Sequence, residues 1–404
     1  MKQPRYYGWS IVTVLAITET LSYGMLIYAF SVFVVPLESH FGWSRATINA
    51  GVTAAQLVAG ALAWPVGVWL DRHGARWLMT GAAVWAACWL VLWSMVSAPW
   101  QHVVVWVMLG IAMAGLLYEP AFVVVANWFV RRRSTALTAL TFVAGFAIII
   151  ATPATEWLIR HFDWQVTAQV FAVIMLVVVA PLHAIWLRRV PSDVGQYVDG
   201  GTHPPQPSAQ VIAVADVWAV VRDGAFWLLT VAFLASTAAL VVVLQTFIPY
   251  LIDQRYTPAD AAWYAAAMGV LALPSRLLFT PLGAYVSRYT IAMLLCIMQS
   301  LALVALVWLP SAWAVWGCVV LFGLSFGAIT PVRAALFAER YGVVAYGAIS
   351  GVLALILTVA RAVVPLAVEL VRHHIGSYDT IYVWVGIVTA VCALLIGLVP
   401  LQAD

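Results

Sequence analysis

Four ionisable side chains stand deep inside long apolar runs, and they are the strongest candidates for chemistry in the chain. Two are acids, Glu19 and Glu119, and two are bases, Arg276 and Arg361. If the runs cross a bilayer, each such group costs roughly 2.5 to 3.5 kcal/mol to insert. Each therefore needs a partner, a water-filled cavity or a function.

The two residue types suit different tasks. Arginine presents a permanently charged planar fork that matches a carboxylate with two parallel hydrogen bonds, so Arg276, assisted by Arg361, is the first choice for binding an anion. A glutamate in an apolar cavity is disfavoured in its charged form, which suits a proton carrier. Glu119 is the first candidate for that role and Glu19 the second. The alternative is that a glutamate neutralises an arginine in a buried ion pair with no further role.

The spacing places all four groups at a similar depth. Glu119 and Arg276 each stand twelve residues before an arginine of the following loop. That separation is about 18 Å of helix. Glu19 and Arg361 are ten and eleven residues from the polar ends of their runs. We expect the four to line one central cavity. Five aromatic residues of the same runs either line that cavity or pack between helices: Tyr23, Tyr28, Tyr118, Phe142 and Phe146.

Composition shows which elements must carry these residues. Hydrophobic residues make up 65% of the 404 residues and charged residues 9%, against about 25% charged in soluble domains. A helix crosses a bilayer with about 20 mostly apolar residues. We therefore predict an all-α membrane protein with twelve transmembrane helices, at 9–37, 46–70, 77–98, 101–129, 135–159, 165–187, 225–252, 260–286, 290–309, 313–337, 346–371 and 378–400.

The distribution of basic residues orients these spans. Twelve lysines and arginines fall in the set of loops that contains both termini, against four in the opposite set. The positive-inside rule then places both termini in the cytoplasm. The Pro- and Gly-rich stretch 188–224 is predicted to be a cytoplasmic linker between two six-helix bundles, 1–187 and 225–404. Within it, 209–221 has the pattern of a short interfacial helix.

Several classes of function are excluded by the same composition. A net charge of +3 is too small for a nucleic-acid partner. The four cysteines lack paired spacing, and we expect no metal site and no cofactor. Because no pairing of a nucleophile with a base and no phosphate-binding loop is recognisable, we do not expect an enzyme.

An internal repeat relates the two halves. The segment Pro65–Arg72 is echoed 216 residues later by Pro281–Arg288, and Pro153 is echoed by Pro365, each late in the fifth span of its half. A parallel repeat of six spans is typical of transporters whose halves rock about a central site.

On these residues the sequence resembles the major facilitator superfamily over essentially the whole chain. The family signature between spans two and three appears as Gly67, Asp71, Arg72, Gly74 and Arg76. In that family the loop is a cytoplasmic gate latch, in which the Asp can pair with an arginine or a helix N-terminus in one state and be released in the other. The resemblance implies a gating role for these five residues, called the latch below. In the second copy, Ser287 replaces the Asp.

Within the superfamily, the sequence is similar to the branch of monocarboxylate and oxalate/formate transporters. The similarity rests on Gly42-Trp43-Ser44, on Asn127-Trp128-Phe129 with the arginines after it, and on Ser275-Arg276. In that branch an arginine of the eighth span holds the substrate carboxylate, and oxalate members add a cation from the eleventh span. The resemblance thus implies these roles for Arg276 and Arg361. The acidic signature at the first span is missing, and Gln165 stands where many relatives have arginine.

The leading hypothesis is a monomeric secondary transporter in the inner or plasma membrane. It would move a small organic anion, specifically a monocarboxylate, by alternating access together with a proton. Arg333, near the cytoplasmic end of span ten, is expected to act in gating. One alternative is a proton-driven exporter of drugs or cations with Glu19 or Glu119 as the cation site, although two central arginines would repel a cation. Another is a sensor or structural membrane protein without flux.

Overall fold

The computed structural model describes residues 6–201, 217–283, 285–309, 311–375 and 377–399. The regular elements in these ranges are all helical, and twelve segments among them are long and apolar enough to cross a membrane. The predicted all-α fold with twelve spans is confirmed. Contacts divide the chain into two compact units, Met1–Ala213 with Gly342–Leu355 and Val214–Tyr341 with Ile356–Asp404.

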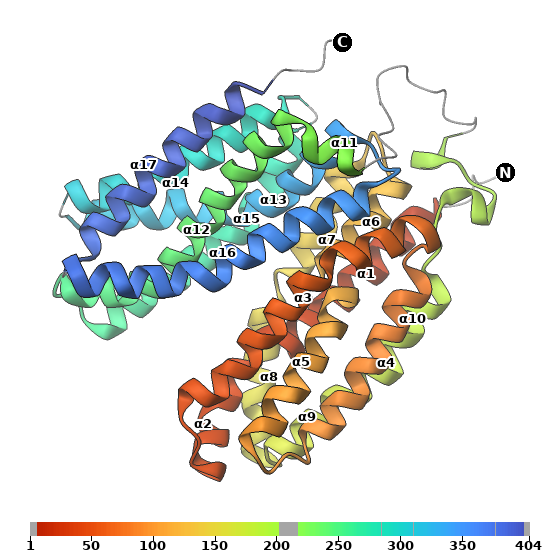
Figure 1. The fold of residues 1–404 in the computed structure, drawn as a ribbon, viewed down its shortest axis with the longest axis horizontal. Helices are drawn as coiled ribbons and strands as arrows, with labels where there is room; N and C mark the ends of the chain where they lie inside the picture. Colours follow the sequence, from red (N-terminus) through yellow and green to blue (C-terminus); the bar gives the residue numbers. More distant parts are fainter. Residues whose placement is uncertain (1–5, 202–216, 284, 310, 376, 400–404) are drawn as a thin grey trace. The chain divides into compact units, whose positions relative to one another are not determined.

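The first unit contains the first six spans, several of which are built from two helices joined at an interruption (Figure 1). Its elements are α1 (Tyr7–Tyr23), η1 (Gly24–Tyr28), α2 (Phe30–Phe41), α3 (Arg45–His73), α4 (Arg76–Trp93), α5 (Pro99–Leu116), α6 (Tyr118–Trp128), α7 (Arg133–Ala144), α8 (Ala147–His161), α9 (Trp164–Ile174), η2 (Met175–Val179), α10 (Ala180–Trp186), η3 (Pro191–Val194) and η4 (Val198–Gly200).

The sequence explains the sharpest of these interruptions. Pro120 would clash with the carbonyl of Leu116 in a continuous helix, so α5 ends at Leu116 and a new helix begins with the proline in its first turn. Leu117 between them is extended, with φ −83° and ψ −169°. In the first span, η1 is one turn of π-helix, closed by a 2.8 Å hydrogen bond from the Ala29 N–H to the Gly24 carbonyl. These breaks lie in mid-span.

Within the first unit, α3 and α4 pack against α5, and α1 packs against α7. Two histidines near the ends of predicted spans, His102 and His183, are fully buried. His102 is held in the core because its Nε2 lies 2.9 Å from the Ile48 carbonyl oxygen and its Nδ1 accepts a 3.1 Å hydrogen bond from Trp93 Nε1. His183 is buried where α10 packs against α4.

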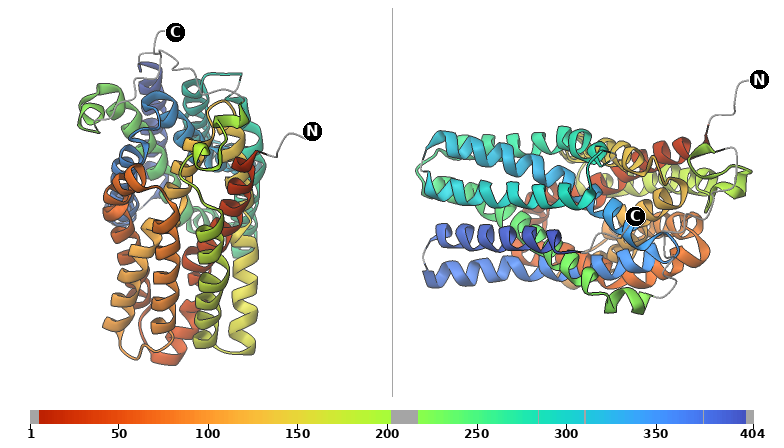
Figure 2. Two further views of the ribbon diagram at one scale, coloured as in Figure 1. Left: turned by 90° about the vertical axis from the view of Figure 1, so that its right-hand side faces the viewer. Right: turned by 90° about the horizontal axis from the view of Figure 1, so that it is seen from above.

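The helices of the second unit run without the mid-span breaks of the first, although Pro249, Pro331 and Pro365 lie inside them. They are α11 (Val217–Arg222), α12 (Gly224–Asp253), α13 (Pro258–Leu282), α14 (Arg288–Trp308), α15 (Ala312–Tyr341), α16 (Tyr346–Ile375) and α17 (Tyr378–Gly397). In this unit α15 packs against α13 and α14, and α17 against α12 and α14, as Figure 2 shows from two further sides.

Two sequence expectations about the second half need comment. Span ten does not end at 337, because α15 continues to Tyr341, where Glu339 forms an ion pair with Arg288. Of the interfacial helix expected at 209–221, residues 209–216 lie outside the described residues and Val217–Arg222 forms α11. The first turns of α16 group with the first unit, since that unit includes Gly342–Leu355.

Candidate functional site

The two intramembrane acids are neighbours in the first unit. Glu19 on α1 is fully buried, and neither of its carboxylate oxygens has a hydrogen-bond partner among the described residues. Glu119 lies in the first turn of α6, directly after the break, and Ser350 Oγ donates a hydrogen bond to its Oε2. Helices α1 and α6, which carry the two acids, pack against each other. Sequence reasoning missed Ser350, which is 231 residues from Glu119 and is part of the same unit.

Three of the five predicted cavity aromatics form a cluster on the two spans that carry these acids. The ring of Tyr118 lies 4.4 Å from that of Tyr23, and Tyr23 lies 6.2 Å from Tyr28, between ring centroids. Tyr118 also stacks on Phe122 at 5.1 Å with the ring planes only 7° apart. The cluster therefore spans α1, η1 and α6.

The remaining two aromatics form a pair of their own. Phe142 and Phe146 meet edge to face with 5.4 Å between ring centroids. They stand where α7 gives way to α8, which is another interruption of a first-half span. Both rings are half-buried.

The predicted bases lie in the second unit. Arg276 on α13 is half-buried, and its Nε donates a 3.1 Å hydrogen bond to the carbonyl of Gly327 on α15. The two helices meet so closely that a Cβ on Gly327 would fall 1.9 Å from the carbonyl oxygen of Ala272. Arg361 on α16 has an exposed side chain. One cavity shared by all four charged residues stays a prediction.

Arg333 lies deeper than the sequence suggested. It is only 9% exposed and stands eight residues before the end of α15, instead of four residues from the end of its span. The reason is the extension of α15 to Tyr341. Its gating role stays a prediction.

At the latch, Asp71 caps a helix from outside. Its carboxylate accepts hydrogen bonds from the backbone N–H groups of Gly347 and Ala348, both at 2.9 Å. Ala345 accepts the first intrahelical bond of α16, from Ile349, so these two N–H groups are among those that a helix leaves unpaired at its start. A negative charge there also interacts favourably with the helix dipole.

Glycines allow the close approach that this cap requires. A Cβ on Gly67 would lie 1.9 Å from the carbonyl oxygen of Gly347, and one on Gly351 would lie 2.3 Å from that of Ala63. Helices α3 and α16 thus touch backbone to backbone within the first unit. The spacing of Gly347 and Gly351 is a small-xxx-small pattern, which is a sequence signal for such contacts.

Two other latch residues, Gly74 and Arg76, contact Arg189 and α10 respectively. Gly74 has φ +78°, in the left-handed region, and a Cβ there would also meet the side chain of Arg189 at 2.9 Å. Arg189 Nη2 in turn donates to the backbone carbonyl of Asp71 at 2.7 Å. Arg76 Nε donates to the Ala184 carbonyl at 2.6 Å, whereas Arg72 is exposed.

In the stretch predicted to be a linker, Asp199 makes a second set of contacts within the same unit. Its carboxylate accepts hydrogen bonds from the backbone N–H groups of Val130, Arg131 and Arg132, at 2.8 to 3.2 Å. Tyr6 packs near this contact and donates its hydroxyl proton to the Trp128 carbonyl. Burial raises the pKa of Tyr6 to about 12, so the phenol stays neutral and remains a donor.

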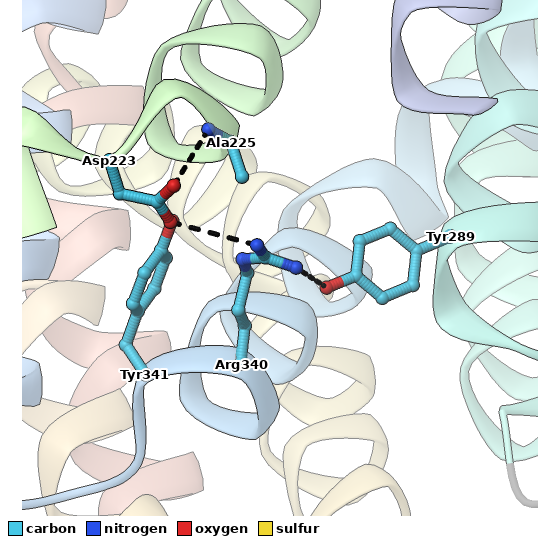
Figure 3. A network of polar contacts seen from close by, with 5 residues as sticks. All are labelled: Asp223, Ala225, Tyr289, Arg340 and Tyr341. Atoms are coloured by element: carbon cyan, nitrogen blue, oxygen red, sulfur yellow. Dashed lines mark hydrogen bonds and ion pairs between the residues drawn. The ribbon is translucent and has the colours of Figure 1, made fainter. Parts of the chain in front are cut away.

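The second unit carries a different network at the corresponding helix ends (Figure 3). Asp223 caps α12 by accepting a 3.1 Å hydrogen bond from the Ala225 N–H, and it accepts another at 3.0 Å from the Tyr341 hydroxyl. Arg340 approaches Asp223 at 3.6 Å and donates to the Tyr289 hydroxyl at 3.0 Å. The network joins the ends of α12, α14 and α15, where the repeated segment has lost its Asp.

Solved structures share this fold. The E. coli fucose:proton symporter FucP aligns with a TM-score of 0.74 and 12% identity, covering 98% of this chain and 100% of that one. The human organic anion transporter MFSD10 (TETRAN) aligns with a TM-score of 0.71 and 13% identity over the same shares.

Sequence relatives point the same way. An uncharacterized MFS-type transporter, YcxA of Bacillus subtilis (strain 168), is 24% identical over 95% of this chain and 92% of its own length. The fujikurins efflux protein of Gibberella fujikuroi is 20% identical over 82% of this chain and 69% of its own. Residues 15–365 match the sequence model of the Major Facilitator Superfamily. Because that match covers most of its length, the chain belongs to the Major Facilitator Superfamily and is a membrane transporter, not an enzyme.

Proposed function

We propose that this transporter moves a small organic anion, specifically a monocarboxylate, and that a proton moves with it. It would do so in the inner or plasma membrane with both termini in the cytoplasm. Arg276 would hold the carboxylate with help from Arg361, and Glu119 and Glu19 would carry the proton. The similarity to the monocarboxylate and oxalate/formate branch supports the substrate class.

The observation that carries the proposal is the way Arg276 is held. An arginine inside a membrane-spanning helix is costly, and the guanidinium of Arg276 donates through Nε to the carbonyl of Gly327 on a closely packed neighbouring helix. Fixing Nε fixes the plane of the guanidinium group. Less conformational entropy is then lost when the group binds a carboxylate through two parallel hydrogen bonds.

The acids support the second half of the proposal. A carboxyl group without hydrogen-bond donors in an apolar environment is more stable when it is neutral, so a site such as that of Glu19 holds a proton readily. Glu119 lies on α6, which packs against the helix of Glu19, and it is connected to α16 through Ser350. A change in the protonation of Glu119 would therefore act on α16, the helix whose start is capped by Asp71 of the latch.

Uptake of labelled monocarboxylates into proteoliposomes, with and without an inward proton gradient, tests the proposal. We expect Arg276→Gln to lose at least about a hundredfold of uptake, because a charged bidentate contact is removed. Arg255→Gln, in the exposed turn before α13, is the matched control and should transport normally. Normal uptake by a folded Arg276→Gln variant would rule out the anion site.

A cation exporter is the second candidate, favoured by one observation. The packed rings of Tyr23, Tyr118 and Phe122 belong to the same two spans as Glu19 and Glu119, and aromatic faces together with acids attract organic cations. One relative is named an efflux protein. Drug susceptibility of cells that express the wild type or Glu119→Gln separates the two functions, since only the exporter would lose protection.

A further inference from the structure

A groove of about 400 Å³ runs along the first unit between α3, α4 and α5. Its volume lies within the usual range for ligand pockets of roughly 300 to 1,000 Å³. Every lining residue is apolar or glycine: Leu62, Pro65, Val66, Trp69, Leu78, Gly81, Ala82, Trp85, Ile111, Ala112 and Gly115.

The spacing of small residues creates this groove. On each helix the lining residues recur at intervals of three and four, which is one helical face. A Cβ on Gly81 would meet no atom within 4 Å, so the missing side chain leaves open space. At Gly115, in contrast, a Cβ would lie 2.9 Å from the Cβ of Ala82, so α4 and α5 close the floor.

The groove lies in the membrane-spanning part of all three helices, so the available occupant is a lipid chain. Two tryptophans at its sides stay partly exposed, Trp69 at 48% and Trp85 at 41%. Aromatic side chains pack well against acyl chains near the membrane interface. An apolar chain in the groove would bury more surface than one on a flat bundle face.

Charge at one end of the groove identifies the headgroup. The lining face of α3 continues one turn beyond Trp69 to Arg72 and His73, and the rings of Trp69 and His73 lie 4.3 Å apart. Arg76 begins α4 at the same end, with its guanidinium 4.8 Å from the centroid of the Trp77 ring. By the arginine bias this end faces the cytoplasmic leaflet, where basic side chains attract anionic headgroups.

We propose that this groove binds an anionic phospholipid of the inner leaflet, with one acyl chain along α3, α4 and α5 and the phosphate at Arg72. The opposite face of α3 carries Gly67 and Asp71 against the start of α16. A lipid bound in the groove therefore stabilises α3, the helix that carries Gly67 and Asp71 of the latch. This binding site is independent of the substrate that the transporter moves.

Thermal unfolding of the detergent-solubilised protein tests the site. Phosphatidylglycerol should raise the melting temperature by about 2–4 °C, because a ligand that binds only the folded state stabilises it. Phosphatidylcholine with the same chains should raise it less, and glycerol phosphate, the headgroup alone, should leave it unchanged. Equal effects of the two phospholipids would overturn the anionic preference, and an effect of glycerol phosphate alone would overturn the acyl-chain site.

Two variants with matched controls locate the binding. Gly81→Leu places a side chain in the groove from a position where a Cβ has open space and should lose the response, whereas Gly269→Leu, at an exposed α13 glycine that also has open space, should keep it. Arg72→Gln should abolish the preference for phosphatidylglycerol, whereas Arg131→Gln, at another exposed arginine, should retain it. A wild-type response from either Gly81→Leu or Arg72→Gln would contradict the proposal.

If Gly81→Leu does not fold, native mass spectrometry can still test the site, because it measures which phospholipids the wild type and Arg72→Gln retain. The wild type, released from micelles that contain equal amounts of the two phospholipids, should retain phosphatidylglycerol preferentially. Arg72→Gln should retain both equally. Equal retention of the two phospholipids by the wild type would exclude a binding site that is specific for the anionic lipid.

Discussion

The two halves of this transporter carry their intramembrane charges on differently built helices. In the first half, Glu119 begins a new helix after the break at Leu117, and Glu19 lies just before the π-helical turn of span one. In the second half, Arg276 and Arg361 lie inside the uninterrupted helices α13 and α16.

The difference has a physical consequence. A helix break leaves backbone groups without intrahelical partners, and π-helical turns are frequent at functional sites because they shift easily. A continuous helix packed backbone to backbone, as α13 and α15 are at Gly327, keeps a side chain in one orientation. We infer that the acids stand on elements that can move and that Arg276, the arginine proposed to bind the anion, stands on a rigid one.

The largest expected effect separates proton movement from anion binding. Glu119→Gln keeps an acceptor for Ser350 but cannot release a proton, so uptake driven by a pH gradient should fall more than about tenfold, while exchange of anion for anion persists. Arg276→Gln should lose both. Both activities are measured in the same proteoliposomes.

Glu156→Gln is the control for that comparison, because Glu156 is an exposed acid paired with Arg160 on α8. It should behave as the wild type does. Loss of exchange in Glu119→Gln would assign this residue to anion binding and remove the division of tasks between the halves.

The second effect concerns the latch. Gly67→Leu places side-chain atoms where the Gly347 carbonyl now lies, so α3 and α16 must separate and the cap by Asp71 is lost. Overpacking of this kind costs about 1–3 kcal/mol, and uptake should fall about tenfold. Ala61→Leu, on the exposed face of α3, should keep wild-type uptake. A functional Gly67→Leu variant would show that this contact is dispensable.

Much of this arrangement could be predicted from sequence for physical reasons. Apolar runs reveal spans because the bilayer excludes unpaired polar backbone, and Glu19, Glu119, Arg276 and Arg361 stand out because charges are rare there. The latch was recognisable from the residue types at Gly67 to Arg76. These signals lie within short stretches of sequence or follow from the exclusion of polar groups by the bilayer.

The remaining features depend on contacts between distant segments. Ser350 gives no signal as a partner of Glu119, because a hydroxyl in a spanning helix usually bonds to its own helix. The extension of α15 was missed because Glu339 and Arg340 look like loop residues until their partners, Arg288 and Asp223, are known. The capping role of Asp199 depends on a loop almost 70 residues earlier.

A smaller effect should follow from restoring continuity to span four. Pro120→Ala supplies an N–H that can bond to the Leu116 carbonyl, so α5 and α6 could join and Glu119 would lose its place at a helix start. Uptake should fall about threefold while the melting temperature rises by roughly 2–4 °C.

The same substitution in the second half provides the comparison. Pro249→Ala changes a proline inside the continuous helix α12, where no break exists to be removed. Its uptake should stay within about twofold of the wild type. Equal losses from Pro120→Ala and Pro249→Ala would show that the interruption itself has no part in transport.

The smallest effect on flux, with a clear effect on stability, is expected at the network of the second unit. Asp223→Ala removes the cap of α12 and leaves Arg340 and the Tyr341 hydroxyl without their shared acceptor. We expect stability to fall by about 1–3 kcal/mol, since buried donors lose a partner, with uptake little changed. Asp260→Ala, an exposed acid in the first turn of α13, controls for loss of charge. Thermal unfolding and uptake measured on the same preparation decide the outcome: a large loss of flux at unchanged stability would mean that this network has the gating role proposed for Asp71 in the first unit.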